Sequence, residues 1–215
     1  MDTYRVAILG CRNRGGHAGR AYKAHHRTEV VGLCDVIEER VNELGDELGV
    51  AARYTDLDVM IEETEPDIVA IPTGTEYHYP LSMRVLDHGV NIDVEKPVTI
   101  DLEQADRLVA RAAEVGSTVA VHHQFRVSPT LRSAHAAINA GRIGSPRYIY
   151  ASGKGYYGGY GVMNIGVHKL NHITKLVGPC RSVSATAVTD GHLITPEDVI
   201  PSPSGMGTIA GENIT

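Results

Sequence analysis

Two hydrophobic patterns alternate along the first part of the chain. Strands are predicted where short apolar runs rich in β-branched residues occur, at 4–10, 29–35, 67–72, 90–95 and 117–123. Helices are predicted where apolar residues recur at helical spacing, at 17–25, 36–49, 56–63, 79–89 and 101–116, with Asp101 as the N-cap of the last. Alternating strands and helices predict an α/β domain at 1–123 with a parallel sheet covered on both faces.

The pattern changes after residue 123. Helices are predicted at 128–144 and 166–178, and strands at 146–155, 181–189 and within 205–215. The mixture predicts a second, α+β domain at 124–215. The last strand pattern stops without a turn or a cap, so we expect the chain to be truncated at its C-terminus.

Composition narrows the class of protein. The 215 residues carry a formal charge of −6, which argues against a nucleic-acid binder because such proteins show a basic surplus. Cys11, Cys34 and Cys180 have neither disulfide-framework nor metal-site spacing, and we expect no metal. No signal-peptide layout and no membrane-length apolar run occurs. We therefore expect a cytoplasmic protein that binds neither membrane nor nucleic acid.

The stretch "ILGCRNRGG" (8–16) follows the first predicted strand and opens a helix. Gly10 and Gly15 match the first and last glycines of the dinucleotide-binding fingerprint, whereas Arg12 replaces the middle one. Asp35 ends the next strand, where an acid binds the ribose hydroxyls of NAD. Arg40, one helical turn further on, leaves NADP open as an alternative cofactor. The plainer interpretation is a glycine turn followed by an ordinary acid at a strand end.

A second stretch, "NIDVEKPVT" (91–99), runs from a strand into Glu95-Lys96-Pro97. Ligands of open α/β sheets bind outside the carboxyl ends of the strands, so Lys96 is placed to contact a substrate oxygen. The alternative is a surface lysine before a turn.

These stretches, together with "IPTGTEYHYP" (71–80), "HQFRVSP" (123–129) and "NIGVHKLN" (164–171), resemble the glucose–fructose oxidoreductase, inositol dehydrogenase and rhizopine catabolism (Gfo/Idh/MocA) family. The order and spacing of five motifs carry the resemblance over nearly the whole chain. It implies an N-terminal Rossmann domain that binds NAD(P). It also implies a C-terminal α+β domain whose open sheet shapes the substrate site and forms a homo-oligomer interface in the full-length protein.

The resemblance also implies roles for individual residues. Lys96 corresponds to the catalytic-site lysine, His168 to the general acid/base, and Asn164 to a position where the family usually has Asp. Cofactor contacts are expected at Gly10, Arg12, Asn13, Arg14, Gly15, Asp35, Pro72, Thr73, His78, Glu95, Lys96 and Gln124. Substrate contacts are expected at Lys96, Arg126, Lys154, Tyr156, Tyr160, Asn164 and His168.

The residue chemistry fits oxidation of a secondary alcohol. An imidazole such as His168 takes up a proton near neutral pH, and a lysine ammonium stabilises a developing alkoxide. Asn164 orients a hydroxyl but exchanges no proton. The simpler alternatives are that Asn164 only caps the helix and that His168 is a structural ring.

The sequence therefore favours an NAD(P)-dependent dehydrogenase that acts on a sugar, inositol or related polyol. Two alternatives stay open. One is a glycosidase-like enzyme of the same family that uses bound NAD. This alternative stays open because position 164 is Asn instead of the usual Asp. The other is a non-catalytic cofactor-binding relative.

Overall fold

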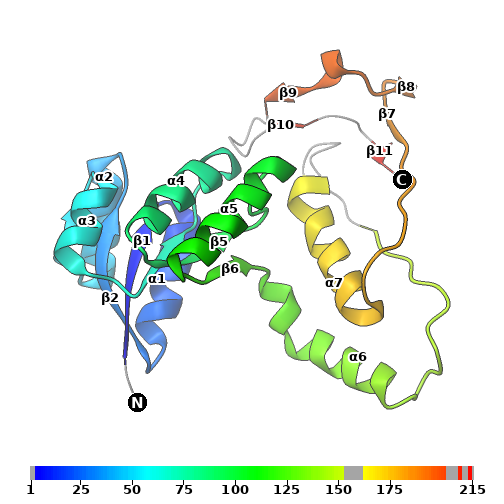
Figure 1. Ribbon diagram of the computed structural model, residues 1–215, viewed down its shortest axis with the longest axis horizontal. Coiled ribbons are helices and arrows are strands. Elements are labelled where there is room, and N and C mark those ends of the chain that lie inside the picture. The colour runs from blue at the N-terminus through cyan, green and yellow to red at the C-terminus, as the bar shows by residue number, and fades with distance from the viewer. Residues whose placement is uncertain (1–2, 153–161, 202–207, 210–212, 215) are drawn as a thin grey trace. The chain divides into compact units, whose positions relative to one another are not determined.

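The computed structural model describes residues 3–152, 162–201, 208–209 and 213–214. The chain divides into two compact units, Met1–His122 and His123–Thr215, called here the N-terminal unit and the C-terminal unit (Figure 1). Each is described by itself.

The N-terminal unit is built on a six-stranded parallel sheet with the strand order β3-β2-β1-β4-β5-β6. Its strands are β1 (Tyr4–Leu9), β2 (Thr28–Cys34), β3 (Arg53–Tyr54), β4 (Ile68–Ile71), β5 (Asn91–Glu95) and β6 (Val119–His122). The predicted α/β fold is confirmed. The strand order reverses beside β1, because β2 pairs on one of its edges and β4 on the other. Open sheets of this kind bind their ligands at this switch point.

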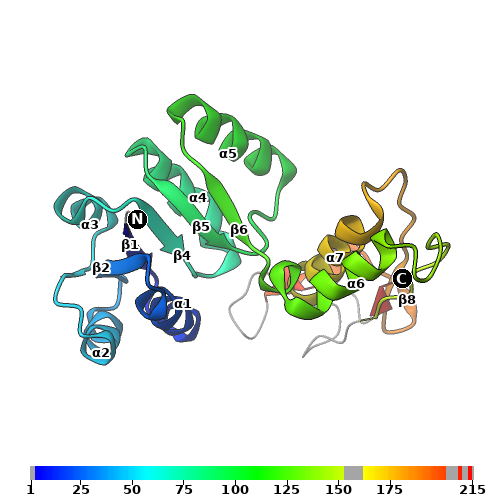
Figure 2. The same cartoon turned by 90° about the horizontal axis from the view of Figure 1, so that it is seen from below.

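Helices cover both faces of this sheet (Figure 2). One face carries α1 (Asn13–Ala24) and α2 (Glu38–Leu48), and the other carries α3 (Leu57–Thr64), α4 (Thr75–Asp87) and α5 (Leu102–Val115). Each face has its own apolar core. Val6, Ile8 and Leu33 meet Leu44 on the first face, whereas Val69 and Ile92 belong to the core on the second. Because strands buried on both faces need apolar side chains on both, the strands read as continuous apolar runs.

The starts of two helices show how nearby side chains determine where a helix begins. The predicted N-cap is confirmed, since the Asp101 carboxylate accepts a hydrogen bond from the Gln104 amide at 2.9 Å. Helix α4 differs from its prediction because it begins at Thr75 rather than at 79, which places Pro80 inside the helix. A proline there cannot donate the usual backbone hydrogen bond. The buried ring of His78, in the first turn of α4, contacts the Thr73 and Pro97 carbonyl oxygens outside the helix.

The C-terminal unit contains short helices and two small antiparallel sheets. Its helical segments are η1 (Gln124–Val127), α6 (Pro129–Asn139), a π-helical turn η3 (Val162–Gly166), α7 (Val167–Val177) and η4 (Pro196–Asp198). One sheet has the order β11-β7-β8, and the other pairs β10 with β9. The strands are β7 (Ala187–Thr189), β8 (His192–Leu193), β9 (Ile200–Pro201), β10 (Thr208–Ile209) and β11 (Asn213–Ile214). An α+β composition is therefore confirmed for this unit.

The strand predictions in this unit were too long. Residues 146–152 form no strand, and the rest of the predicted strand 146–155 lies outside the described residues. Tyr148 and Tyr150, which suggested a strand by their alternation, are about four-fifths exposed. The strand predicted at 181–189 shortens to Ala187–Thr189. Alternation alone makes no strand where no neighbouring strand pairs with it.

No helix among the described residues is long and apolar enough to cross a membrane. No group of three or more His, Cys, Asp or Glu side chains among them is arranged to hold a metal ion.

Candidate cofactor and active site

The turn after β1 is packed so closely that two of its positions require glycine. Gly10 has a φ of +110°, and its amide donates to the Cys34 carbonyl at 2.7 Å. A β-carbon at Gly15 would lie 1.9 Å from the Gly10 carbonyl oxygen, so α1 lies directly against the end of β1. Arg12 occupies the N-cap position of α1 and is exposed. Its side chain therefore leaves the inside of the turn open, and the start of α1 is the part of a helix that binds anions.

Asp35 follows β2 directly and is only 8% exposed. One carboxylate oxygen accepts the Cys11 amide at 2.8 Å, and the other accepts the Ile37 amide at 3.0 Å. Arg40 Nη1 lies 3.6 Å from the second oxygen. An ionised carboxylate has about four acceptor sites, so Asp35 holds the glycine turn and keeps capacity for ribose hydroxyls.

The imidazole of His78 joins two loops at the same edge of the sheet. The ring is 1% exposed, with Nδ1 at 2.7 Å from the Pro97 carbonyl oxygen and Nε2 at 3.2 Å from that of Thr73. Burial lowers the pKa of His78, and its two carbonyl partners oppose this shift. The ring thus holds Thr73, which follows β4, near Pro97, which follows β5.

Lys96 and Glu95 lie at the end of β5. The Glu95 carboxylate forms an ion pair with Arg14 of α1 and also accepts the Lys96 amide at 3.1 Å. The Lys96–Pro97 peptide bond is cis. Burial lowers the pKa of the Lys96 ammonium, and the positive charge of Arg14 lowers it further. A lysine with a lowered pKa is a stronger hydrogen-bond donor and exchanges protons more readily than an ordinary surface lysine.

The structure therefore gathers most of the expected cofactor residues at one edge of one sheet. The following residues lie at or just beyond the carboxyl ends of β1, β2, β4 and β5: Gly10, Arg12, Asn13, Arg14, Gly15, Asp35, Pro72, Thr73, Glu95 and Lys96.

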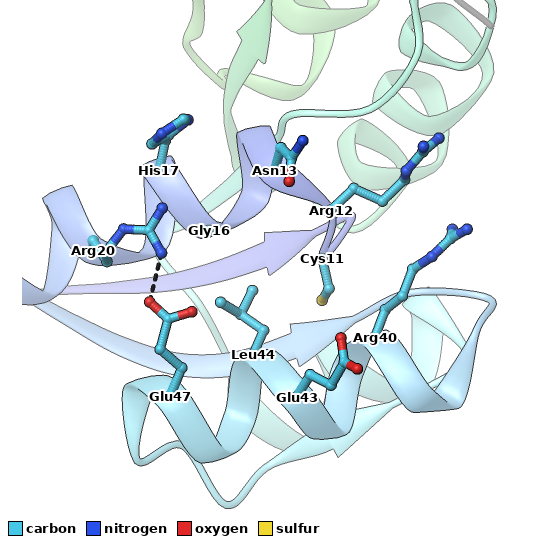
Figure 3. Close-up of a pocket in the computed structure, with 10 residues that line it drawn as sticks. All are labelled: Cys11, Arg12, Asn13, Gly16, His17, Arg20, Arg40, Glu43, Leu44 and Glu47. Atoms are coloured by element: carbon cyan, nitrogen blue, oxygen red, sulfur yellow. Dashed lines mark hydrogen bonds and ion pairs between the residues drawn. The ribbon is translucent and has the colours of Figure 1, made fainter. Parts of the chain in front are cut away.

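A pocket of about 450 Å³ opens beside this edge, between α1 and α2 (Figure 3). It is lined by Cys11, Arg12, Asn13, Gly16, His17, Arg20, Arg40, Glu43, Leu44 and Glu47. Most of these residues are polar or charged, which suits a hydrophilic ligand or part of one.

His168 is the centre of a second group, which belongs to the C-terminal unit. Its side chain is 5% exposed, although it lies in the first turn of α7. The ring of Phe125 meets it edge-on with centroids 4.9 Å apart, and His123 does so at 5.7 Å. Edge-to-face contacts fix the plane of a ring. No role was predicted for Phe125 from the sequence. It is the only Phe of the chain and lies between Gln124 and Arg126, which were expected to contact the cofactor and the substrate.

Asn164 does not occupy the N-cap position of α7. It is the third residue of the π-helical turn η3, which runs directly into the helix, and Gly166 is the residue that precedes α7. Asn164 and His168 therefore lie four residues apart within one continuous helical segment. Single π-helical turns of this kind occur often at functional sites.

Arg126 and Gln124 lie on η1, next to α7. Arg126 Nη1 donates to Asn171 Oδ1 at 3.3 Å, so the expected substrate contact is engaged with α7 in this structure. Gln124 Oε1 is buried and has no hydrogen-bond partner among the described residues. Lys154, Tyr156 and Tyr160 lie outside the described residues.

Comparison with protein families identifies one match. Residues 4–123, more than half of the chain, match the Gfo/Idh/MocA model, described as an oxidoreductase family with an NAD-binding Rossmann fold.

Individual relatives agree with this match. The chain is 26% identical over 211 residues to D-apiose dehydrogenase of Paraburkholderia graminis, an alignment that covers 93% of this chain and 56% of that enzyme. It is 31% identical over 201 residues to UDP-N-acetylglucosamine 3-dehydrogenase of Acidithiobacillus ferrooxidans, covering 88% of this chain and 61% of that enzyme. The chain thus spans less than two thirds of the length of these curated relatives.

A solved structure supports the same relationship. The WlbA dehydrogenase of Bordetella pertussis, in complex with NADH and UDP-GlcNAcA, superposes with a TM-score of 0.76 at 25% identity, covering 92% of this chain and 65% of that one. The family match, the relatives and the fold agree, and the chain belongs to the Gfo/Idh/MocA oxidoreductase family.

Proposed function

We propose that this protein is an NAD-dependent oxidoreductase that transfers a hydride between the nicotinamide and a hydroxyl-bearing carbon of a sugar, inositol or related polyol. The observation that carries the proposal is the glycine turn. Gly10 and Gly15 leave no room for side chains there, and Asp35 holds the turn through the Cys11 amide. The names of the relatives support the substrate class, since they include D-apiose dehydrogenase and scyllo-inositol 2-dehydrogenase.

The residues at the sheet edge fit a dinucleotide. We assign the pyrophosphate to the turn Gly10–Gly15 and the start of α1, where backbone amides and the exposed Arg12 and Asn13 surround a cradle that a β-carbon would fill. Asp35 is assigned to the adenosine ribose. When bound, NAD supplies the hydride acceptor. Pro72, Thr73 and Gln124 are further proposed contacts, and His78 acts by holding Thr73 and Pro97 in place.

Lys96 is proposed to stabilise charge on the reacting oxygen. Its ammonium is partly removed from water, where a positive donor stabilises an alkoxide more strongly than it does in bulk solvent. Glu95 and Arg14 hold the strand end that carries it.

His168 is proposed to take the hydroxyl proton. Imidazole titrates near neutral pH, and the rings of Phe125 and His123 fix its plane. Asn164 is proposed to orient the substrate without exchanging a proton. Alcohol oxidation needs both a base for the hydroxyl proton and charge stabilisation on the hydroxyl oxygen.

Substrate contacts at Lys154, Tyr156, Tyr160 and Arg126 remain proposals that rest on the family resemblance. Flat aromatic rings with hydroxyl groups suit the apolar faces and the polar rim of a sugar.

The proposal is tested by turnover with D-apiose, scyllo-inositol and UDP-N-acetylglucosamine, substrates that the names of the relatives suggest. Reduction of NAD is followed by the absorbance of the reduced nicotinamide. Lys96→Ala and His168→Ala should each lower kcat by about a hundredfold or more. Lys175→Ala, an exposed lysine in the last turn of α7, is the control and should leave turnover unchanged. Turnover that survives both active-site changes contradicts the assignment of the two residues.

A glycosidase-like reaction that uses bound NAD is the second candidate, and the Asn at position 164 keeps it open. The family usually carries a carboxylate at this position, and an amide cannot relay a proton. Release of the leaving group from aryl glycosides, without net formation of reduced cofactor, would support this candidate over the dehydrogenase.

We also propose a cytoplasmic location and a homo-oligomeric full-length form. Cys11, Cys34 and Cys180 are all free thiols, which suits a reducing compartment. Cell fractionation tests the location, and light scattering of the purified protein tests the assembly.

A further inference from the structure

The two units of the chain carry opposite net charge. Twelve Lys and Arg against 22 Asp and Glu give the N-terminal unit a formal charge of −10, whereas eight against four give the C-terminal unit +4. Residues 123–189 contain no Asp or Glu at all. Their eight cations are Arg126, Arg132, Arg142, Arg147, Lys154, Lys169, Lys175 and Arg181. Charge of one sign that is collected in one unit attracts ligands of the other sign.

The helical elements around His168 all belong to this range without acids. The segments η1, α6 and α7 pack against one another (Figure 2). None of them contains a carboxylate, and neither does the π-helical turn η3 before α7. The polar residues four positions before and three positions after His168 are the uncharged amides Asn164 and Asn171. No acid of these four elements therefore repels an anion that approaches His168.

Arg126 is the cation that η1 places beside α7. It follows Phe125, whose ring lies 4.9 Å from that of His168 between centroids. Arg126 Nη1 donates to Asn171 Oδ1 at 3.3 Å, so the contact of this exposed side chain among the described residues is with an amide and not with a carboxylate. The guanidinium keeps further N–H donors beside this single contact, and a planar set of donors suits the paired oxygens of a carboxylate or a phosphate.

Lys169 is the cation of α7 that directly follows His168, and its side chain is partly buried. Burial lowers the pKa of His172, and the positive charge of Lys169 lowers it further, which shows that the ammonium lies near this ring. No acid among the described residues pairs with Lys169. Removing an ammonium from water without a counter-charge costs free energy, and a bound anion offsets that cost.

We propose that Arg126 and Lys169 bind an anionic group of the substrate, so that the enzyme acts on an acidic carbohydrate that carries a carboxylate or a phosphate. This inference rests on the proposed function and names the substrate class within it. Arg126 supplies paired donors in a plane, and Lys169 supplies a compact charge. A neutral polyol gains nothing from either charge.

The test is calorimetric titration of matched sugars into the full chain saturated with NADH. D-Glucuronate is compared with D-glucose for the carboxylate, and UDP-N-acetylglucosamine with N-acetylglucosamine for the phosphate. The anionic member of at least one pair should bind about tenfold more tightly or better, and the pair that shows this preference identifies the anionic group. Higher salt should weaken the binding of the anionic member and leave that of the neutral member unchanged.

Variants assign the preference to the two cations. Arg126→Gln and Lys169→Gln should each reduce it by about fivefold to tenfold, and binding of the neutral sugar should stay within about twofold. In turnover the loss should appear in KM rather than in kcat. Lys175→Gln is the matched control, since it removes the same charge from the exposed last turn of the same helix, and it should change the preference by less than about twofold.

The outcomes separate this inference from the proposed function. Equal binding within both pairs of sugars overturns the inference and leaves the proposed function intact. Equal losses for Lys169→Gln and Lys175→Gln also overturn it, because the effect would then be general charge. Weaker binding of NADH in Arg126→Gln and Lys169→Gln overturns it as well, because the cations would then hold the cofactor. Preferential binding of an anionic sugar without reduction of NAD by any sugar supports the anion site and contradicts the proposed function.

Discussion

The two units of this protein bury their side chains in different ways. The buried apolar residues among the described positions all belong to the N-terminal unit, in one core on each face of its sheet. In the described part of the C-terminal unit the one buried side chain is His168. The first unit is thus stabilised by apolar packing, whereas the second surrounds a single imidazole with rings.

This difference supports different proposed roles for the two units, cofactor binding for the first and substrate selection for the second. A close-packed parallel sheet fixes the positions of its loops within narrow limits, which suits recognition of a cofactor of constant shape. A small helical unit with little buried apolar surface varies more readily and suits the part that selects among substrates. Two pairs of variants, one ring deletion and one charge change test this comparison, in order of decreasing expected effect.

The largest effect is expected from truncating a leucine in each unit. Leu86 of α4 is fully buried, and Leu86→Ala should lower the free energy of unfolding by about 3 kcal/mol through lost burial and a cavity. Leu170 of α7 is more than half exposed, and Leu170→Ala should cost less than about 0.5 kcal/mol. Denaturant unfolding followed by circular dichroism measures both. Equal losses would remove the contrast between the units.

The next largest loss of stability is expected from a substitution in the glycine turn. Gly15→Ala should destabilise the protein by about 2 kcal/mol and weaken NADH binding, because the new methyl group collides with the Gly10 carbonyl. Gly16→Ala is the adjacent control in the same helix, where the added carbon meets only the end of the Arg20 side chain at 3.2 Å. This change should be neutral or stabilise by about 0.5 kcal/mol. The pair is compared by thermal unfolding and by titration with NADH. A tolerated Gly15→Ala would show that the turn is looser than described.

These glycines also show what could be predicted from the sequence. Alternation of strands and helices predicted the sheet, because a parallel sheet covered on both faces leaves long apolar runs. The glycines at positions 10 and 15 predicted the turn, because the close approach between them depends on residues near each other in the sequence.

Contacts between distant residues could not be predicted in this way. The ring of His78 is held by the Pro97 carbonyl, nineteen positions away, and Glu95 pairs with Arg14 from the first helix. The strand predicted at 146–155 is absent over the described residues 146–152 for a related reason, since strand formation depends on a partner strand that local alternation does not reveal.

Removing a ring that packs against His168 should cause a smaller loss of stability, in the C-terminal unit. Phe125→Ala removes one edge-to-face contact with His168 and a second, at 5.9 Å, with His172. Because the Phe125 side chain is about half exposed, the loss in stability should be about 1 kcal/mol. Phe125→Tyr keeps the ring and should restore most of it. Hydrogen exchange of the α7 amides localises the change, and an effect spread evenly over both units would contradict a local role.

The smallest effect concerns an exposed ion-pair cluster in the N-terminal unit. Hydrogen bonds from Arg84 and then from His88 lower the pKa of Asp58 below its usual value. Since the folded-state pKa is depressed, this stabilisation is present above the unfolded-state pKa of about 3.9 and is lost as the pH falls through the folded-state value. The free energy of unfolding should therefore fall less from neutral to acid pH in Asp58→Asn than in the wild-type protein. The difference should be less than about 1 kcal/mol, because the group is exposed and screened by salt. Unfolding of both proteins at pH values on either side of this range measures it: Asp58→Asn should cost more stability at neutral pH than in acid, and a larger loss in acid than at neutral pH would reverse the assigned sign.

We propose that cofactor recognition belongs to the N-terminal unit and proton transfer to the C-terminal unit. The most direct measurement is calorimetric titration of NADH into the wild-type protein, Asp35→Asn and His168→Gln, with thermal unfolding to confirm that each variant is folded. We expect Asp35→Asn to weaken NADH binding by about tenfold and His168→Gln to stay within about twofold of the wild-type protein. Loss of binding in His168→Gln together with unchanged binding in Asp35→Asn would contradict this assignment.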